Sequence, residues 1–324
     1  MRCLVGGLIV MLLALPAVRG DDTEKPPSPE EQYQELTKKF NAERSQIVSD
    51  FGKAKGEEQN KLRQKYFGLG KEYAGKFFEL AEKNPKDPVA TDALFWILQN
   101  GDDSPIFSKA VEKAAASISD MPLKDLKARL RAIRTNSTKL LEAVAARAEK
   151  ADKDPAEADL LAWVAMNGSN LSVGEKAIAR LVDKYPDNPA ITQVCMVLSR
   201  SASPKAIDSL KTIMEKSSKN QVKATAALAI AGNYYGQVDK LQDKVAEADK
   251  AAAEAAKYYT MVIEQYAKDS AAQKKQAEKE LKALKTTRVG KVAPIITAPD
   301  LDEKEFKLSD YRGKVVLLDF WGNW

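Results

Sequence analysis

The spacing of apolar residues over most of the chain predicts amphipathic helices. Near the amino end one apolar face recurs at intervals of three, four, seven and four residues, and it consists of Tyr33, Leu36, Phe40, Ile47 and Phe51. These intervals follow the helical period of 3.6 residues. We therefore expect a helix that begins near Glu30 and bends or ends over residues 52–56, which contain two glycines.

A signal for the start of a helix recurs along the chain. Asp or Asn directly precedes proline at Pro88, Pro155 and Pro189. An Asp or Asn side chain caps the free N–H groups of a first helical turn, and proline at the first helical position has no N–H to satisfy. The gaps between these prolines are 67 and 34 residues, and Pro122 falls between the first two with its acidic residue offset by one. The series continues at Asn220 and indicates units of about 34 residues.

A period near 34 with two helices in each unit resembles the tetratricopeptide class of helical repeat. The tryptophan, glycine and tyrosine signature of that class is not visible in these units. We predict a tetratricopeptide-like α-helical repeat domain over residues 30–285. Trp96 and Trp163 stand in dense apolar clusters and are expected in its core rather than in a ligand site. Ser172 and Glu175 have the spacing of a capping box at one helix start.

The end of the chain has a different pattern. A charged turn leads into an apolar run at residues 315–318, followed by Asp319 and by the aromatic residues Trp321 and Trp324. Strands that are buried on both faces are nearly continuous apolar runs, so this segment predicts an interior strand. Before it, residues 295–297 and 305–307 have the pattern of a hairpin joined by residues 299–302.

Residues 289–294, 308–314 and 315–324 resemble, in order and spacing, the thioredoxin fold. The branch concerned includes TlpA-like thiol–disulfide proteins and the alkyl hydroperoxide reductase/thiol-specific antioxidant group. The resemblance covers about the last 36 residues and implies that residues 286–324 are the truncated amino-terminal part of an α/β thioredoxin-like domain. The predicted fold class is therefore mainly α, with this α/β segment behind the helical repeats. The resemblance also points to a bacterial protein.

The same resemblance implies two site residues. In the family, the tryptophan that matches Trp324 directly precedes a Cys-x-x-Cys motif, and the acid that matches Asp319 handles a proton for the second cysteine. A carboxylate inside an apolar strand has a raised pKa, which suits proton transfer near neutral pH. The alternative is that Asp319 only ends the strand and is solvated. We favour that alternative for this chain, because it lacks the cysteine pair and is expected to be inactive.

The first 20 residues have the organisation of a secretory signal. Arg2 precedes an apolar stretch at residues 4–15, and small residues stand before an expected cleavage site at Asp21. The apolar stretch is short for a membrane span. We expect export to the periplasm, the cell envelope or the medium, with membrane attachment only if the signal is not cleaved. Residues 21–29 are acidic and rich in proline, which predicts a disordered spacer.

The amino-acid composition limits which catalytic, metal-binding and nucleic-acid-binding functions are possible. The sequence has two cysteines and no histidine, so Ser–His and Cys–His catalysis and the commonest transition-metal ligand are excluded. Cleavage of the signal would remove Cys3, and Cys195 lies in an apolar context typical of a buried helix face. A reactive thiol at Cys195 is the weaker alternative, because no cation adjoins it. We expect no cofactor and no bound metal. The net charge of +5, from 51 basic and 46 acidic residues, is too small to indicate nucleic-acid binding.

Two functions follow as hypotheses. The first is the amino-terminal portion of an exported thiol–disulfide oxidoreductase or antioxidant protein, whose helical domain docks protein or peptide partners and whose substrates are disulfide-bearing proteins. The aromatic context before the family's motif favours a two-cysteine site over a one-cysteine peroxiredoxin site. The second is a helical-repeat scaffold that binds proteins and has no enzymatic activity.

Overall fold

The computed structural model describes residues 26–102, 104–152, 154–201, 203–241, 243–286, 295–300 and 302–319. These residues contain thirteen α-helices and one two-stranded sheet, so the chain is mainly α, as the sequence predicts. The predicted signal segment (residues 1–20), residues 21–25 of the predicted spacer, residues 287–294 of the linker and Trp324 lie outside the described residues. Within the described part of the chain, no helix is both long and apolar enough to cross a membrane.

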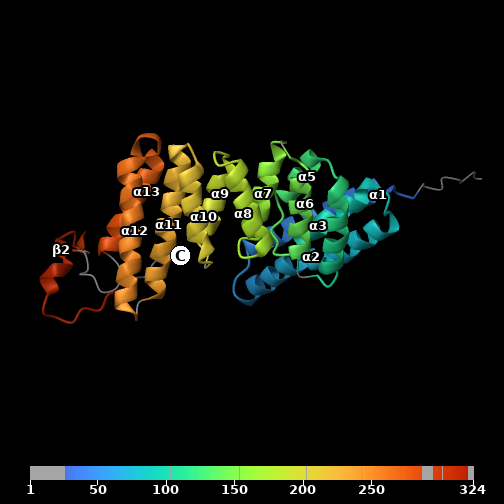
Figure 1. The fold of residues 1–324 in the computed structure, drawn as a ribbon. Helices are drawn as coiled ribbons and strands as arrows, with labels where there is room; N and C mark the ends of the chain where they lie inside the picture. Colours follow the sequence, from blue (N-terminus) through green and yellow to red (C-terminus); the bar gives the residue numbers. More distant parts are fainter. Residues whose placement is uncertain are drawn as a thin grey trace, which may run out of the picture.

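The helices follow one another with short connections (Figure 1). They are α1 (Pro29–Phe51), α2 (Glu57–Lys83), α3 (Pro88–Asn100), α4 (Phe107–Ser117), α5 (Leu123–Leu130), α6 (Thr138–Glu149), α7 (Ala156–Asn167), α8 (Ser172–Lys184), α9 (Ala190–Leu198), α10 (Lys205–Lys216), α11 (Asn220–Lys240), α12 (Val245–Gln265) and α13 (Ala271–Thr286). Short 3₁₀ turns lie at Ile118–Asp120, Ala267–Asp269 and Leu308–Tyr311.

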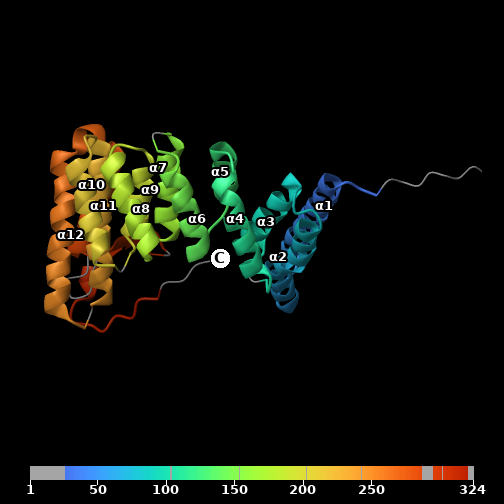
Figure 2. The same ribbon diagram turned by 45° about the vertical axis from the view of Figure 1, so that its right-hand side comes forward.

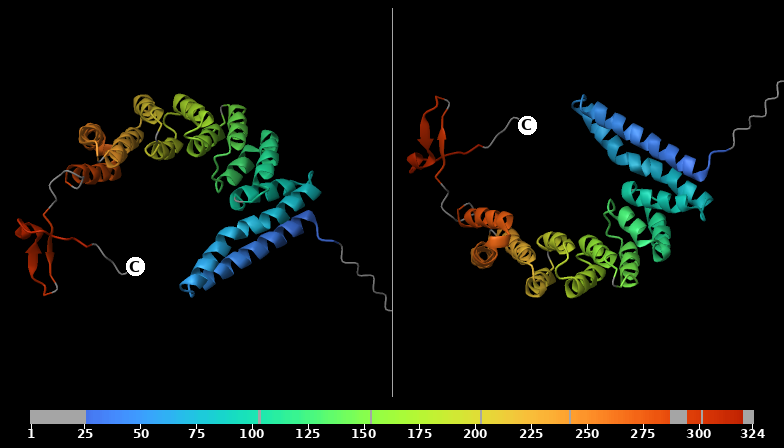
Figure 3. Two further views of the ribbon diagram at one scale, coloured as in Figure 1. Left: turned by 90° about the horizontal axis from the view of Figure 1, so that it is seen from below. Right: turned by 90° about the horizontal axis from the view of Figure 1, so that it is seen from above.

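From α4 onward the helices pack in two rows. Helices α4, α6, α8 and α10 contact one another in sequence and form the outer row, while α5, α7, α9, α11 and α13 form the inner row. Seen along the helices, the rows curve into an arc with the inner row on its concave side (Figure 3). The long pair α1–α2 forms one arm of this arc, and the carboxy-terminal hairpin lies beyond its other end (Figures 2 and 3).

One continuous apolar core runs between the rows. Its buried members extend from Phe40 in α1 to Leu284 in α13, and none of the described residues 295–319 belongs to it. Trp96 stacks on the Phe77 ring at a centroid distance of 3.9 Å. The indole Nε1 of Trp163 donates a hydrogen bond of 2.9 Å to the carbonyl oxygen of Leu130. Both tryptophans are core residues, as predicted, and the helical region therefore has a core of its own.

Three of the predicted helix-start signals are confirmed, whereas α5 after Pro122 and α11 at Asn220 begin without a side-chain cap. The Oδ1 atoms of Asp87, Asp154 and Asn188 each accept a hydrogen bond from the backbone N–H two residues later, at 2.9, 2.8 and 2.8 Å. Each such cap contributes about 1 kcal/mol to helix stability. Because the cap and the following proline act locally, two adjacent residues mark where each of these three helices begins.

The capping-box prediction at Ser172 is wrong. Helix α8 begins at that residue without a side-chain cap, and Glu175 pairs instead with Lys205 of α10, at 2.8 Å. A reciprocal capping box occurs at the start of α1. Glu31 N donates to Ser28 Oγ at 3.2 Å, and Ser28 N donates to the Glu31 carboxylate at 2.7 Å. This box starts the helix at Pro29, inside the segment predicted as spacer.

Helices α3 and α7 carry the same features 67 residues apart. The equivalent pairs are Trp96 with Trp163, Asn100 with Asn167, and Gly101 with Gly168. In both helices the asparagine Nδ2 donates to the tryptophan carbonyl oxygen, at 3.0 Å in α3 and 2.9 Å in α7. The following glycine N–H donates at 2.8 Å to the last turn of each helix. This equivalence supports an internal repeat, whereas the tetratricopeptide class itself stays a prediction.

The carboxy-terminal segment forms the predicted hairpin with one strand shifted. Strands β1 (Thr297–Pro299) and β2 (Glu305–Lys307) pair antiparallel, with Ala298 opposite Phe306. Asp300 holds the turn, since its Oδ1 accepts from the backbone N–H groups of residues 302 and 304, both at 2.9 Å. These bonds start the turn directly after Pro299, so the first strand lies two residues later than expected.

The predicted strand at residues 315–318 is not formed. Val315 and Leu317 are 103% and 92% exposed, and no described residue pairs with this stretch. An interior strand is stabilised by neighbouring strands on both edges and by cover on both faces. The described residues supply neither, which explains the exposed backbone here.

Candidate functional site

The inner row of helices presents two hollows that meet at α9. The first, called the basic hollow, has a volume of about 800 Å³ and lies over α5, α7 and the start of α9. The second, called the neutral hollow, has a volume of about 600 Å³ and lies over α9, α11 and α13. Gln193 lines the first and Thr192 the second, so the two hollows adjoin the same helix, α9, of the inner row. The inner row lies on the concave side of the arc (Figure 3).

The basic hollow takes its charge from one stripe of α5. Lys124, Lys127 and Arg131, the C-cap residue directly after α5, recur at intervals of three and four residues, which aligns them on one face, and Arg134 follows. Lys127 pairs with Asp159 of α7. Lys124 and Arg131 are exposed and form no ion pair with any described carboxylate. The lining therefore has four cations and one anion.

The floor of the basic hollow is apolar. Leu160 and Trp163 are buried side chains of α7 that close it from below, and the partly buried Met166 extends the same surface. The Trp163 indole N–H is already bonded to the Leu130 carbonyl oxygen, so the ring presents carbon to the hollow. A ligand that fits here combines negative charge at the rim with apolar contact at the floor.

The neutral hollow has a different chemistry. Met196 of α9 is 59% exposed within it, and the partly buried Leu228 and Tyr235 of α11 line it beside amide and hydroxyl side chains. Tyr259 is a buried member of the lining, and burial, with a smaller contribution from nearby Glu280, raises the pKa of its phenol. Glu280 is the one charged residue in the lining. The hollow therefore offers uncharged, partly apolar contacts.

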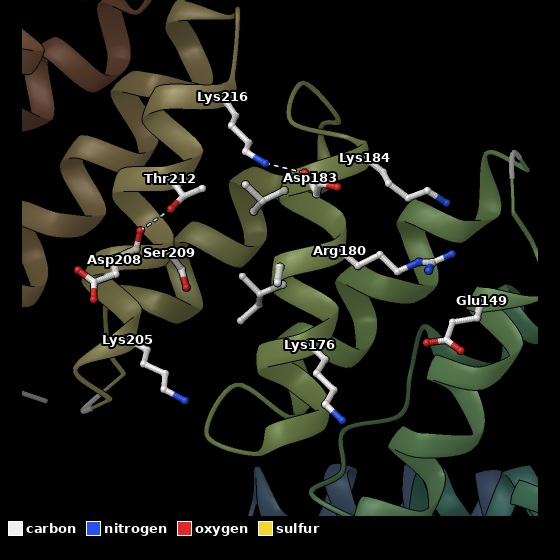
Figure 4. A pocket seen from close by; sticks show the side chains of 13 residues that line it. Glu149, Lys176, Arg180, Asp183, Lys184, Lys205, Asp208, Ser209, Thr212 and Lys216 are labelled. Carbon is white, nitrogen blue, oxygen red and sulfur yellow. Dashed lines mark hydrogen bonds and ion pairs between the residues drawn. The ribbon is translucent and has the colours of Figure 1, made fainter.

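The outer row also has a hollow, of about 890 Å³, between α8 and α10 (Figure 4). Its charged side chains are largely engaged in ion pairs between neighbouring helices. Ion pairs of this kind join α2 to α4, α4 to α6 and α8 to α10, and they are Glu82–Lys113 at 2.7 Å, Glu112–Lys139 at 2.6 Å, Glu175–Lys205 at 2.8 Å and Asp183–Lys216 at 2.6 Å. The hydrogen bond and charge of Lys216 lower the pKa of Asp183. We assign this face to helix–helix contact rather than to ligand binding.

One buried carboxylate joins α7 to α8. Glu157 is 0% exposed and accepts from Arg180 at 2.6 Å, from Tyr185 Oη at 2.6 Å and from Lys184 at 3.2 Å. Burial raises the pKa of this carboxyl group, but the hydrogen bonds from Tyr185, Arg180 and Lys184 outweigh burial, so the net pKa is lowered. Glu157 is thus an ionised structural residue. Its role was not predictable from the sequence, because an acid in the first turn of a helix is common and its partners Arg180, Lys184 and Tyr185 lie 23 to 28 residues further on.

The predicted redox residues are only partly described. Asp319 is exposed in the structure, and Trp324 lies outside the described residues. Cys195 is fully buried in α9, as predicted, and burial raises the pKa of its thiol to about 12. Because the thiolate is the reactive form, Cys195 is not a nucleophile in the folded chain. The described residues contain no group of three or more acidic or cysteine side chains arranged to hold a metal ion.

Comparison with known proteins gives one short similarity. No family model matches the chain. A stretch of 36 residues, 11% of the chain, is 53% identical to the thiol-disulfide oxidoreductase ResA of Geobacillus thermodenitrificans and 56% identical to ResA of Geobacillus kaustophilus. A stretch of 37 residues is 46% identical to ResA of Bacillus anthracis. In each case the chain spans about a fifth (21%) of the relative's length.

The match is as long as residues 289–324, the segment whose motifs resemble the thioredoxin fold. Among solved structures, a computationally designed self-assembling cyclic homooligomer aligns with 79% of this chain and 97% of its own, at 16% identity. Its TM-score of 0.23 is too low to indicate a shared fold. The comparisons therefore give information about the short stretch alone and none about the helical region.

Proposed function

We propose that this chain is part of an exported thiol–disulfide oxidoreductase in which a curved helical domain docks partner proteins beside a thioredoxin-like domain. The observation that carries the proposal is the similarity of 46–56% to ResA proteins over 36–37 residues. The described hairpin β1–β2 is compatible with it, because the resembled domains have a hairpin before their central strand.

The reacting thiols of this proposal are not among the cysteines of the sequence. Disulfide exchange requires an accessible thiolate, and Cys195 is buried with a pKa of about 12. Cys3 belongs to the segment proposed as an export signal. The proposal therefore assigns catalysis to a cysteine pair after Trp324 in the natural gene product, with Asp319 as the acid that serves it.

The test compares two proteins in an insulin-reduction assay with dithiothreitol as electron donor. The natural-length gene product is expected to accelerate reduction, whereas the 324-residue chain is expected to match the rate without enzyme. Turnover by the 324-residue chain, or none by the natural-length protein, would contradict the proposal. Amino-terminal sequencing of the protein from its source tests the export step, and a start at Asp21 is the expected result.

The second candidate function is a protein-binding scaffold without enzymatic activity. It is favoured by the basic and neutral hollows, together called the inner groove, and by the separate core of the helical region, which includes no residue of the described segment 295–319. The two candidates differ in what deletion of everything after residue 286 does to the natural-length protein. A scaffold keeps its bound partners after this deletion, whereas a docking domain that works with a redox domain loses the mixed disulfides that trap its substrates.

A further inference from the structure

We propose that the inner groove binds an extended polypeptide that carries acidic residues at one end and apolar residues about five or six positions away. The basic hollow would take the acidic residues and the neutral hollow the apolar ones. This inference deepens the docking role proposed for the helical domain by naming the chemistry of the partner.

The charge distribution supports the acidic end. Cations at three- and four-residue spacing on one helix face repel one another and are unfavourable for an isolated helix. Lys124, Lys127 and Arg131 are nevertheless aligned on α5, and only Lys127 has a described carboxylate partner. At the contacts of α2 with α4, α4 with α6 and α8 with α10, by contrast, four cations are paired with acids of a neighbouring helix. An acidic ligand would supply the counter-charges that the α5 stripe lacks.

The second hollow supports the apolar end. Met196 is 59% exposed on a short helix, next to Leu228 and Tyr235, and the surrounding side chains are mostly uncharged. Methionine and tyrosine are favoured in binding surfaces because they give large contact area with adaptable packing. Charged side chains are depleted from the centres of protein interfaces, which is the composition of this hollow.

The spacing follows from helix packing. The basic hollow is centred on α7 and the neutral hollow on α11, with α9 between them. Packed helices lie about 8–10 Å apart, so the two centres are about 16–20 Å apart. An extended chain advances about 3.3 Å per residue, so this span corresponds to about five or six residues. A single peptide segment can therefore fill both hollows at once.

A polypeptide fits better than a nucleic acid. Proteins that bind single strands stack bases on accessible aromatic side chains, but Trp163 in the basic hollow is a buried floor residue. The net excess of three cations in its lining is also confined to one helix and its end. The experiment below includes an oligonucleotide so that this alternative has its own outcome.

The test is fluorescence anisotropy on the 324-residue chain with a fluorescein-labelled peptide. The peptide has four glutamates, a spacer of five glycine and serine residues, and the sequence Leu-Phe-Leu. Two control peptides replace the glutamates by lysines or the Leu-Phe-Leu sequence by three serines. We expect each control peptide to bind at least about tenfold more weakly in 50 mM salt, because one loses charge complementarity and the other loses its apolar contacts.

Variants test the residues named. The Lys124→Glu/Arg131→Glu protein should bind the glutamate peptide at least about tenfold more weakly, because two attractive contacts become repulsive. The matched control Lys109→Glu/Lys176→Glu changes net charge equally, at exposed cations of the outer row without described ion pairs, and should bind within about twofold of the wild type. Met196→Ser should weaken binding about threefold through lost apolar contact. Circular dichroism should show an unchanged helical spectrum for all three.

Three results would overturn the inference. They are absence of binding by the glutamate peptide, equal binding by the Lys124→Glu/Arg131→Glu and control proteins, and tighter binding of a 12-nucleotide single-stranded RNA that displaces the peptide. None of these results bears on insulin reduction by the natural-length protein, so failure of this inference and failure of the redox proposal can be told apart.

Discussion

The buried carboxylate of Glu157 gives the sharpest test of how the helical rows are held together. Replacement by glutamine keeps the shape of the side chain but removes its charge. Arg180 and Lys184 then lose their shared counter-ion, and the amide has one acceptor oxygen where the carboxylate has two. The contact between α7 and α8 should weaken in consequence.

The size of the effect follows from burial. Removing one partner of a fully buried ion pair costs about 3–5 kcal/mol, and hydrogen bonds to charged groups contribute about 1.5–3 kcal/mol. The side chains of Arg180 and Lys184 are 32% and 33% exposed, so both cations can turn toward water after the change. We therefore expect Glu157→Gln to lower the free energy of unfolding by about 2–3 kcal/mol, near the lower end of these ranges.

The assay is urea unfolding at pH 7 followed by circular dichroism at 222 nm. The matched control is Asp183→Asn, which breaks a pair of the same length with Lys216 at a carboxylate that is 70% exposed. We expect a much smaller shift of the urea midpoint for the control, because exposed pairs are screened by water. Equal midpoints for Glu157→Gln and the wild type would refute the reasoning, as would a larger shift for Asp183→Asn.

The pH dependence gives a second check on Glu157. Its pKa is lowered in the folded protein, so the unfolded chain takes up a proton more readily. The stability that its charge contributes is therefore present above the ordinary pKa of about 4.5 and is lost as the pH falls through the lower folded value. The stability difference between wild type and Glu157→Gln should shrink as the pH is lowered from 7 to 3. A difference that stays constant over this range would contradict the assignment of an ionised carboxylate.

Further predictions concern three other positions. Cys195, with a thiol pKa of about 12, should escape alkylation by iodoacetamide at pH 8 in the folded chain and react after denaturation, as peptide mapping would show. Gly174→Ala should destabilise the chain by about 1–3 kcal/mol or more in urea unfolding, because a Cβ there would lie 1.9 Å from the Gly168 carbonyl oxygen. Asp187, bonded to the Ser217 and Ser218 hydroxyls, should titrate at about pH 2 by carbon NMR, and its stabilising effect should be lost as the pH falls from 4 toward 2.

Local signals in the sequence predicted the helices well. The caps at Asp87 and Asn188 act within two residues of the sequence. The apolar clusters around Trp96 and Trp163 correctly predicted core positions, because helical periodicity is visible over a few neighbouring residues. The capping box predicted at Ser172 failed for the opposite reason, because Glu175 pairs with Lys205 on a different helix. A local pattern in the sequence does not indicate such a distant partner.

The candidate site is formed by contacts between distant segments, so the sequence predicted less of the site than of the helices. The α5 stripe of Lys124, Lys127 and Arg131 could have been found from its helical spacing, which is visible in the sequence. That its hollow and the hollow of Met196 both adjoin α9 depends on how distant helices pack, which a local sequence pattern does not indicate. The strand expected at residues 315–318 failed because its apolar pattern presupposes neighbouring strands.

The central claim, that the last residues begin a redox domain, is tested most directly by differential alkylation and peptide mapping of the natural-length protein from its source. Free thiols are labelled first, disulfides are then reduced, and the new thiols are labelled with a heavier reagent. The account predicts a peptide that runs through Asp319 and Trp324 into two cysteines separated by two residues, with both reagents present in proportions that change with the reductant. A natural peptide that ends at Trp324, or continues without cysteines, would contradict it.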